Sequence, residues 1–146
     1  MSSLAAQKAT IAQLLAHVNS WNLEAIAALF APGFVRVLQP GRSVESREVN
    51  GDELILGLSR LGSTFITPVK YDFRNYVHDG DAHKSSFEFT NAAETRLGPF
   101  GLEGVMILEF TEDGTKIFRL VEYVDSKVYM AFREKLAAAM KGGPPN

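Results

Sequence analysis

The chain has 146 residues, of which 46% are hydrophobic and 22% are charged, enough for one hydrophobic core and too few for two ordinary domains. Lys and Arg number 15 against 17 Asp and Glu, a formal charge of -2, which leaves no basic surface for nucleic acid. The lack of cysteine excludes disulfides, thiolate nucleophiles and the usual zinc ligand sets. We predict a single domain over residues 1–141 and a disordered tail over residues 142–146.

The sequence has no pattern typical of a membrane or secretory segment. No apolar run approaches the ~20 residues that a membrane-spanning helix needs. The first 20 residues carry Gln7, Lys8, Gln13 and His17 where a signal peptide would have an apolar centre. We therefore expect a cytoplasmic protein with no membrane partner.

Helical periodicity dominates the start of the chain. Apolar residues recur three and four apart between Leu4 and Val18, which predicts a first helix. Asn22 is a residue type that favours helix N-caps, so a second, short helix is expected to follow it and to end at Pro32-Gly33. Residues 34–38 then predict a strand.

A polar stretch and a third helix come next. Residues 39–49 are polar and show no periodicity. Asn50 is followed three residues later by Glu53, the spacing of a capping box, in which each side chain binds the other residue's backbone N–H group. The third helix is predicted to begin there and to end at Gly62.

Strand patterns fill most of the second half of the chain. Four β-rich runs separated by turns cover residues 69–77, 84–95, 101–111 and 115–124. Four consecutive strands of this kind predict an antiparallel meander. Asp125-Ser126 then caps a last helix, so the predicted fold class is α+β.

Turn chemistry predicts the register of the last two strands and therefore which side chains are buried. A three-residue hairpin loop at 112–114 sets Leu108 opposite Phe118 and puts Glu122 on the apolar face. A two-residue turn would set Leu108 opposite Arg119 instead, so the three-residue loop is preferred.

The hairpin before it is predicted in the same way. A three-residue loop at 78–80 pairs Tyr71 with Phe87 and puts Asn91 on the apolar face. Two histidines flank this turn at a spacing that superficially suggests a metal site. Hairpin turns use these residue types in any case, so no metal site is predicted.

Three polar residues are predicted to share the apolar interior as catalytic groups. Burial of Glu122 among apolar neighbours should favour its neutral form and suit it to acid–base work near neutral pH. Arg36 shares a strand face with Phe34 and Leu38, where its guanidinium would stabilise an oxyanion, and Asn91 would donate to the same oxygen. The alternatives are a surface Glu122, an Arg36 at the rim, and an Asn91 that satisfies a strand bulge.

The wall of the predicted pocket is apolar and largely aromatic, as suits a bulky substrate, although such residues first of all form cores. The residues predicted to bind substrate are Leu14, Phe34, Leu38, Leu58, Tyr71, Phe73, Phe87, Phe89, Met106 and Leu120. No glycine-rich phosphate loop opens a helix, so no nucleotide cofactor is expected.

The order of these elements resembles the nuclear transport factor 2-like superfamily, and specifically its SnoaL-like group of polyketide cyclases and fungal meroterpenoid isomerases. The resemblance is carried by the stretches 19–24, 25–32 and 121–125 within the predicted succession of helices and strands. It implies a cone-like barrel in which a curved antiparallel sheet wraps around N-terminal helices, with a helix at the C-terminal end. The same fold hosts many functions.

What the resemblance implies about chemistry depends on the residues at the matching positions. Ketosteroid isomerases would place a tyrosine at Leu14 and an aspartate base at Leu38, so their mechanism is not carried over unchanged. Limonene-epoxide hydrolase would place an aspartate at Glu122, and that carboxylate is retained. The predicted function is a cofactor-free isomerase or cyclase acting on a polycyclic polyketide or terpenoid intermediate of natural-product biosynthesis. The alternatives are an epoxide or lactone hydrolase and a non-catalytic ligand-binding or dimerisation module.

The opposite face of the predicted sheet indicates how the chain assembles. Val105, Ile107, Ile117, Val121 and Tyr123 are predicted to share that face. Together they would form an apolar patch too large to leave in water. A homodimer is therefore expected, as is common in the family that the sequence resembles.

Overall fold

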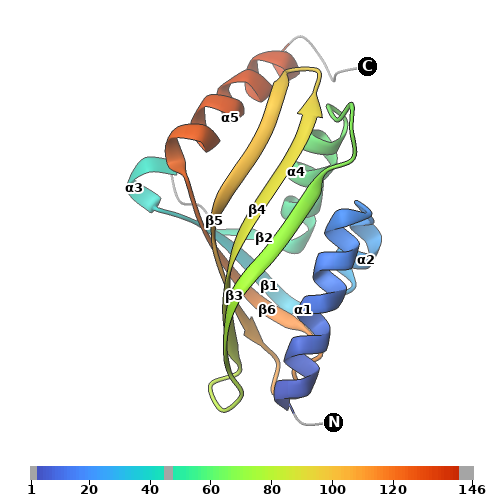
Figure 1. Cartoon of the computed structure of the whole chain (residues 1–146), viewed down its shortest axis with the longest axis vertical. Helices are drawn as coiled ribbons and strands as arrows, with labels where there is room; N and C mark the ends of the chain where they lie inside the picture. Colours follow the sequence, from blue (N-terminus) through green and yellow to red (C-terminus); the bar gives the residue numbers. More distant parts are fainter. Residues whose placement is uncertain (1–2, 45–47, 142–146) are drawn as a thin grey trace.

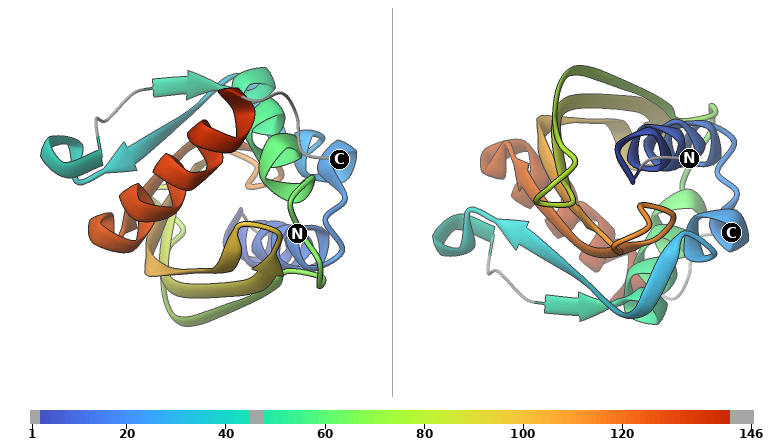
Figure 2. Two further views of the ribbon diagram at one scale, coloured as in Figure 1. Left: turned by 90° about the horizontal axis from the view of Figure 1, so that it is seen from above. Right: turned by 90° about the horizontal axis from the view of Figure 1, so that it is seen from below.

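The computed structural model describes residues 3–44 and 48–141 and has an α+β fold (Figure 1). Its elements are α1 (Ser3–Asn19), α2 (Leu23–Ala27), β1 (Phe30–Gln39), α3 (Gly41–Val44), β2 (Glu48–Asn50), α4 (Gly51–Gly62), β3 (Lys70–Asp79), β4 (Lys84–Thr95), β5 (Gly98–Phe110), β6 (Ile117–Val124) and α5 (Ser126–Lys141). A strongly curved sheet wraps around α1, α2 and α4, and α5 lies alongside the upper part of β5 (Figures 1 and 2). The predicted α+β cone with a C-terminal helix is confirmed.

The sheet has six strands in the order β2-β1-β6-β5-β4-β3. The predicted meander is confirmed, because β3, β4, β5 and β6 pair with their neighbours in antiparallel fashion. The sheet as a whole is mixed rather than antiparallel, since β1 pairs with β6 in parallel. The long path from β1 through the helices and the meander back to β6 permits this, as parallel neighbours need a long crossover.

The predicted helices are present, and their caps explain where they begin. The Asn22 side chain accepts the backbone N–H of Ala25 at 3.1 Å and opens α2. The capping box at α4 is complete, with 2.9 Å from the Glu53 N–H to the Asn50 side chain and 3.4 Å for the reciprocal bond. The helix ends at Gly62 as predicted.

Two local predictions at the start of the sheet are corrected. The second helix ends at Ala27, and β1 already begins at Phe30, four residues before the predicted strand. The polar stretch 39–49 contains α3 and the start of β2, and a cis peptide bond joins Gln39 to Pro40. The predicted tail over residues 142–146 lies outside the described residues.

The register predicted for the β5–β6 hairpin is wrong by two residues. Leu108 lies opposite Leu120 rather than Phe118, because the loop is wider than three residues and a bulge interrupts the start of β6. The bulge turns Phe118 outward, where 42% of it is exposed, and turns Ile117 inward, where it is fully buried. Ile117 therefore does not belong to the predicted apolar patch on the outer face.

A carboxylate explains the wider loop. The Asp113 Oδ1 accepts the backbone N–H of Thr115 at 3.0 Å and the hydroxyl groups of Thr111 and Thr115 at 2.8 Å each. These hydrogen bonds stabilise the ionised carboxylate and lower the pKa of Asp113. Hydrogen bonds of the Asp113 side chain therefore close this loop, and a prediction based only on hairpin loop length does not account for them.

The register predicted for the β3–β4 hairpin is wrong by four residues. Tyr71 lies opposite Asn91 instead of Phe87. The turn is longer than three residues, and a bulge at Asn75, which has a φ of 57°, adds a residue to β3. Because the shift is even, Tyr71 keeps its predicted face but acquires a polar neighbour.

The hydrophobic core fills the space between the concave face of the sheet and the helices. Its most deeply buried side chains come from the middle of the meander and include Phe87, Phe89, Leu108 and Phe110. Val44 on α3 and Leu54 on α4 belong to the same cluster. One continuous core therefore connects both halves of the chain.

Leu108→Ala is expected to lower the free energy of unfolding by about 2–5 kcal/mol, because it removes fully buried methyl groups and leaves a cavity. Urea denaturation followed by circular dichroism measures this loss. Leu56→Ala is the matched control, since 52% of Leu56 is exposed on α4, and its effect should stay within about 0.5 kcal/mol. Equal losses for the two variants would contradict the position of the core.

Candidate functional site

Glu122 is the acid of the candidate site. It lies on β6 between the inward-facing residues Leu120 and Val124, so its carboxylate is on the concave side despite the corrected register. Burial raises the pKa of Glu122 by disfavouring the charged form, and the positive charge of Arg36 opposes this without cancelling it. Burial therefore moves the titration of the Glu122 carboxyl group toward neutral pH, which suits a group that both takes up and returns a proton.

Arg36 is the cation that faces this acid. It lies on β1 opposite Leu120, and Leu38 lies opposite Glu122, so Arg36 is the diagonal neighbour of the acid on the concave face. The Nε of Arg36 is buried and has no hydrogen-bond partner among the described residues. A buried donor without a partner indicates a position that a ligand oxygen could occupy.

Asn91 and Tyr71 form the opposite side of the site. Asn91 is 6% exposed, and its Oδ1 accepts the backbone N–H of Leu102 at 2.8 Å. Tyr71 lies directly opposite Asn91 across the β3–β4 pair. Burial and the negative charge of Glu122 both raise the pKa of Tyr71, so its hydroxyl remains protonated.

The structure brings the four polar side chains onto one face from four different strands. The sequence predicted Glu122, Arg36 and Asn91 as polar groups of the site but treated Tyr71 only as part of the apolar wall. The polar role of Tyr71 depends on the strand register, which was predicted incorrectly. Its alternation with Phe73 on the inward face was the only sequence signal that could have suggested it.

The residues predicted to bind substrate are part of the packed core. Leu14, Phe34, Leu38, Phe73, Phe87, Phe89, Met106 and Leu120 are buried in one cluster, and Leu58 and Tyr71 are partly buried against it. Their contact with a substrate stays a prediction. Leu38 and Met106 lie directly opposite Glu122 on its two neighbouring strands, and Leu120 lies opposite Arg36, so these three apolar residues are in closest register with the acid and the cation.

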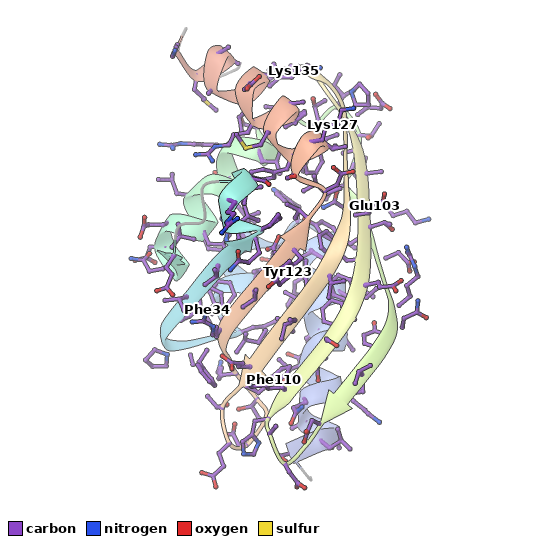
Figure 3. All side chains as sticks on the ribbon, turned by 90° about the vertical axis from the view of Figure 1, so that its left-hand side faces the viewer. Phe34, Glu103, Phe110, Tyr123, Lys127 and Lys135 are labelled. Carbon is purple, nitrogen blue, oxygen red and sulfur yellow. The ribbon has the colours of Figure 1, made fainter. Side chains whose placement is uncertain are left out.

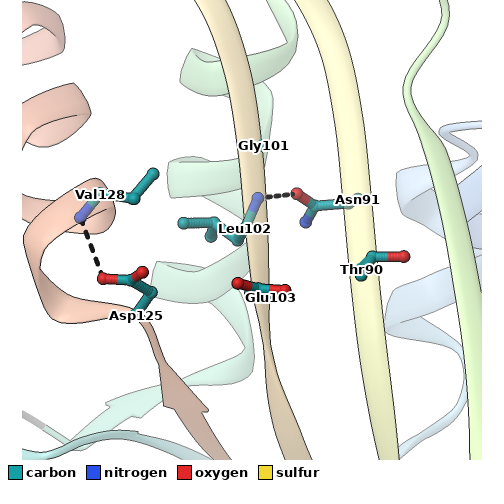
Figure 4. A pocket seen from close by; sticks show the side chains of 7 residues that line it. All are labelled: Thr90, Asn91, Gly101, Leu102, Glu103, Asp125 and Val128. Atoms are coloured by element: carbon teal, nitrogen blue, oxygen red, sulfur yellow. Dashed lines mark hydrogen bonds between the residues drawn. The ribbon is translucent and has the colours of Figure 1, made fainter.

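Two hollows open on the surface, and sequence reasoning predicted neither. One, of about 200 Å³, is lined by Thr90, Asn91, Gly101, Leu102, Glu103, Asp125 and Val128 (Figure 4). The other, of about 310 Å³, is lined by Ala27, Phe30, Ala31, Gly33, Phe34, Asn50, Gly51 and Asp52. Asn91 and Phe34 are the predicted site residues that reach them, so the Asn91 end of the site adjoins a surface hollow.

Residues 3–44 and 48–141 contain neither a metal-binding cluster nor a membrane-spanning helix. No group of three or more His, Asp or Glu side chains in these ranges is arranged to hold a metal ion. No helix in the same ranges is long and apolar enough to cross a membrane. The two turn histidines predicted to be structural do occupy the β3–β4 hairpin, where His78 Nδ1 lies 2.7 Å from the Ser85 hydroxyl.

Comparison with solved structures establishes the class of fold. The crystal structure of BvnE pinacolase from Penicillium brevicompactum superimposes with a TM-score of 0.84 at 21% sequence identity and covers 94% of each chain. The chain therefore has the nuclear transport factor 2-like cone fold of SnoaL-like proteins, as the sequence resemblance implied. No protein-family model matches the sequence.

Sequence relatives come from fungi. Core atranone cluster protein 11 of Stachybotrys chlorohalonatus is 27% identical over 135 residues, which cover 91% of this chain and 98% of the relative. Monooxygenase AacuO of Aspergillus aculeatus is 26% identical over 141 residues, which cover 94% of this chain and 86% of the relative. The similarity thus extends over nearly the whole length of both.

Proposed function

We propose that the protein is a cofactor-free isomerase or cyclase that moves protons on a polycyclic polyketide or terpenoid intermediate. The observation that carries this proposal is the carboxyl group of Glu122, which is half-buried on an apolar face beside the cation Arg36 and has a pKa raised by desolvation. Such a group is basic enough to remove a proton from carbon next to a carbonyl and acidic enough to return it.

The proposed reaction needs no second reactant. The Glu122 carboxylate removes a proton from a carbon beside a carbonyl group, and the electrons of the C–H bond form an enolate. Arg36 stabilises the negative charge that develops on the enolate oxygen. In a β,γ-unsaturated ketone the enolate is a dienolate, and the protonated Glu122 returns the proton to its γ carbon, which leaves the catalyst unchanged and the double bond moved. In a cyclisation the enolate carbon instead attacks a second carbonyl carbon, and the protonated Glu122 gives its proton to the alkoxide that forms. Asn91, as predicted from the sequence, contributes to binding the same oxygen.

The names of the relatives and the structural neighbour support chemistry on natural products without agreeing on the reaction. One is named for an atranone cluster, one as a monooxygenase and one as a pinacolase. The monooxygenase name favours oxygenation as a second candidate function. Hydrolysis of an epoxide or lactone would use the same carboxylate to activate water.

Isotope incorporation distinguishes these reactions on polycyclic polyketide and terpenoid ketones. Proton transfer through an enolate is expected to place deuterium from D₂O on carbon in the product and no labelled oxygen in a new functional group. Ketone oxygens exchange with water without an enzyme, so hydrolysis is indicated only by H₂¹⁸O label in a new hydroxyl or carboxyl group, and label from ¹⁸O₂ would indicate oxygenation. If ketones bind but none is converted and no C–H exchange occurs, the protein is a ligand-binding module.

We also propose that the protein forms a homodimer through the outer face of the sheet. Val77, Ile107 and Val121 lie in one register row across this face, and Val105 and Tyr123 lie in the next. Tyr123 is central on this face in Figure 3 and is 46% exposed. Ion pairs border the row, with 3.0 Å between Lys84 and Glu109 and 3.6 Å between Arg119 and Glu109.

The dimer is expected to give twice the chain mass in light scattering at micromolar concentration. Val105→Glu should convert it to a monomer, because a charge in the centre of a desolvated interface is costly. Ile66→Glu is the control, since Ile66 is exposed outside the patch and its substitution should leave the mass unchanged. A monomeric wild-type chain would contradict the assembly.

A further inference from the structure

Arg36 and Glu122 carry opposite charges but do not form an ion pair. They lie on neighbouring strands, since Arg36 is opposite Leu120 and Glu122 is opposite Leu38, and both share the concave face with these buried leucines. Within the part of the chain that the structure describes, neither side chain forms a hydrogen bond or a salt bridge. Both residues are half-buried, so part of each can be reached from outside. Their donors and acceptors are therefore available to a bound molecule.

The net charge at this place depends on one proton. A guanidinium group is never deprotonated in proteins, so Arg36 contributes a fixed positive charge. The pKa of Glu122 lies above its ordinary value, because burial disfavours the charged form. The pair is therefore neutral when Glu122 is ionised and carries one positive charge when Glu122 is protonated.

Other titratable groups near the concave face come from β3 and from the helices. Tyr71 on β3 stays a neutral phenol, because burial raises its pKa. On the helices of the described chain, the titratable side chains that are not exposed are His17 on α1 and Tyr129 on α5. Histidine is the residue type that titrates near neutral pH, so a test of Glu122 needs a control at His17.

We propose that the ligand of this site carries a planar oxyanion, a carboxylate or the ionised enol of a 1,3-dicarbonyl group, which Arg36 binds while Glu122 takes up a proton. The fork of N–H donors on a guanidinium group matches two oxygens that share one negative charge. An ionised Glu122 repels such a group, so anion binding and protonation of Glu122 favour each other.

The proposal rests on the proposed function only for the polycyclic frame of the ligand. In the proposed reaction, a protonated Glu122 faces a delocalised oxyanion once the proton has left carbon. A ligand that is already an anion reproduces this arrangement without any reaction. Binding therefore tests the charge of the site separately from catalysis.

Two pairs of probes separate the charge of the ligand from its shape. Anthraquinone-2-carboxylate is compared with its neutral amide, and ionised 2-hydroxy-1,4-naphthoquinone is compared with its neutral methyl ether. Both acids are fully ionised between pH 6 and pH 8, so the ligand's charge stays constant while Glu122 titrates. Isothermal titration calorimetry in two buffers of different ionisation enthalpy gives the dissociation constant and the number of protons taken up.

Each anion should bind the wild-type protein at pH 6 about 10–100-fold more tightly than its neutral partner, the range expected for hydrogen bonds between charged groups. Its affinity should fall by up to about tenfold for each pH unit above the raised pKa of Glu122, because one proton is taken up on binding. The neutral partners should take up no proton. The anion that binds more tightly identifies which oxyanion the site accepts.

Four variants assign these effects to residues. Glu122→Gln should bind the anions at pH 8 at least as tightly as the wild type does at pH 6, without proton uptake, since the amide is always neutral. Arg36→Gln should weaken binding of the anions by about 10–100-fold and change binding of the neutral partners much less. His17→Gln is the control for titration, and Arg74→Gln, which removes an exposed and paired cation, is the control for charge. Both controls should behave as the wild type.

Three results would overturn the proposal: neither anion binds, the neutral partners bind as tightly as the anions, or proton uptake persists in Glu122→Gln and is lost in His17→Gln. These results are distinguishable from failure of the proposed function. Exchange of C–H hydrogen with D₂O in neutral ketones would support proton transfer even if the anions do not bind. Tight anion binding without such exchange would leave this proposal valid and contradict the catalytic one.

Discussion

Glu122→Gln is expected to reduce turnover by a factor on the order of 10²–10⁴, the usual contribution of a general acid–base residue. The amide has the same shape as the protonated carboxyl group but cannot accept and return a proton near neutral pH. Substrate affinity should change much less, because the shape and polarity of the site are retained. Steady-state kinetics, with kcat and KM separated, measure both effects.

The stability of the same variant provides a check that does not depend on a substrate. Because the pKa of Glu122 is raised in the folded state above its ordinary value of 4.5, ionisation of the buried carboxyl costs stability. This cost is absent well below pH 4.5 and is complete above the raised pKa. Glu122→Gln should therefore be more stable than wild type at neutral pH, and the difference should shrink as the pH falls toward 4.

A matched substitution separates the role of Glu122 from a general effect of removing a carboxylate. Glu94→Gln changes an exposed carboxylate on β4 and is expected to leave both activity and stability close to wild type. If Glu122→Gln keeps wild-type turnover, the proton shuttle is not at this position and the polar face described above is structural.

Arg36→Ala is expected to reduce turnover by about 10²–10³-fold, because it removes the charge that stabilises the enolate oxygen. Arg36→Lys should recover little of this, since a planar fork of donors is replaced by a point charge. Arg74→Ala is the control. Arg74 forms ion pairs of 3.3 Å with Asp72 and 3.5 Å with Glu88 on the exposed side of the sheet, where such pairs contribute little.

The pH dependence distinguishes the charge of Arg36 from its geometry. Arg36 lowers the pKa of Glu122, so Arg36→Ala should raise that pKa further. In a plot of kcat/KM against pH, the rising limb that reports ionisation of Glu122 should therefore move to higher pH. Arg36→Lys keeps the charge and should leave the limb near its wild-type position while the rate remains low. An unshifted limb in Arg36→Ala would contradict the electrostatic interaction between the two residues.

Local patterns were sufficient to predict most of the elements and part of the site. The Asn50–Glu53 capping box and the Asn22 cap involve residues three apart, so their sequence spacing determines their geometry. Glu122 was assigned to the concave face even though its register was wrong. Successive side chains on a strand point to opposite faces, so a register error of two residues leaves Glu122 on the face that was predicted.

The tertiary structure alone decided which residues face one another across strands. The opposition of Tyr71 and Asn91 depends on a bulge at Asn75 and on a turn longer than the preferred type. The place of Arg36 beside Glu122 depends on the parallel pairing of two strands separated by about eighty residues of chain. Periodicity reports the face on which a side chain lies, whereas partners across the sheet are selected by loop closure and core packing, which no local pattern records.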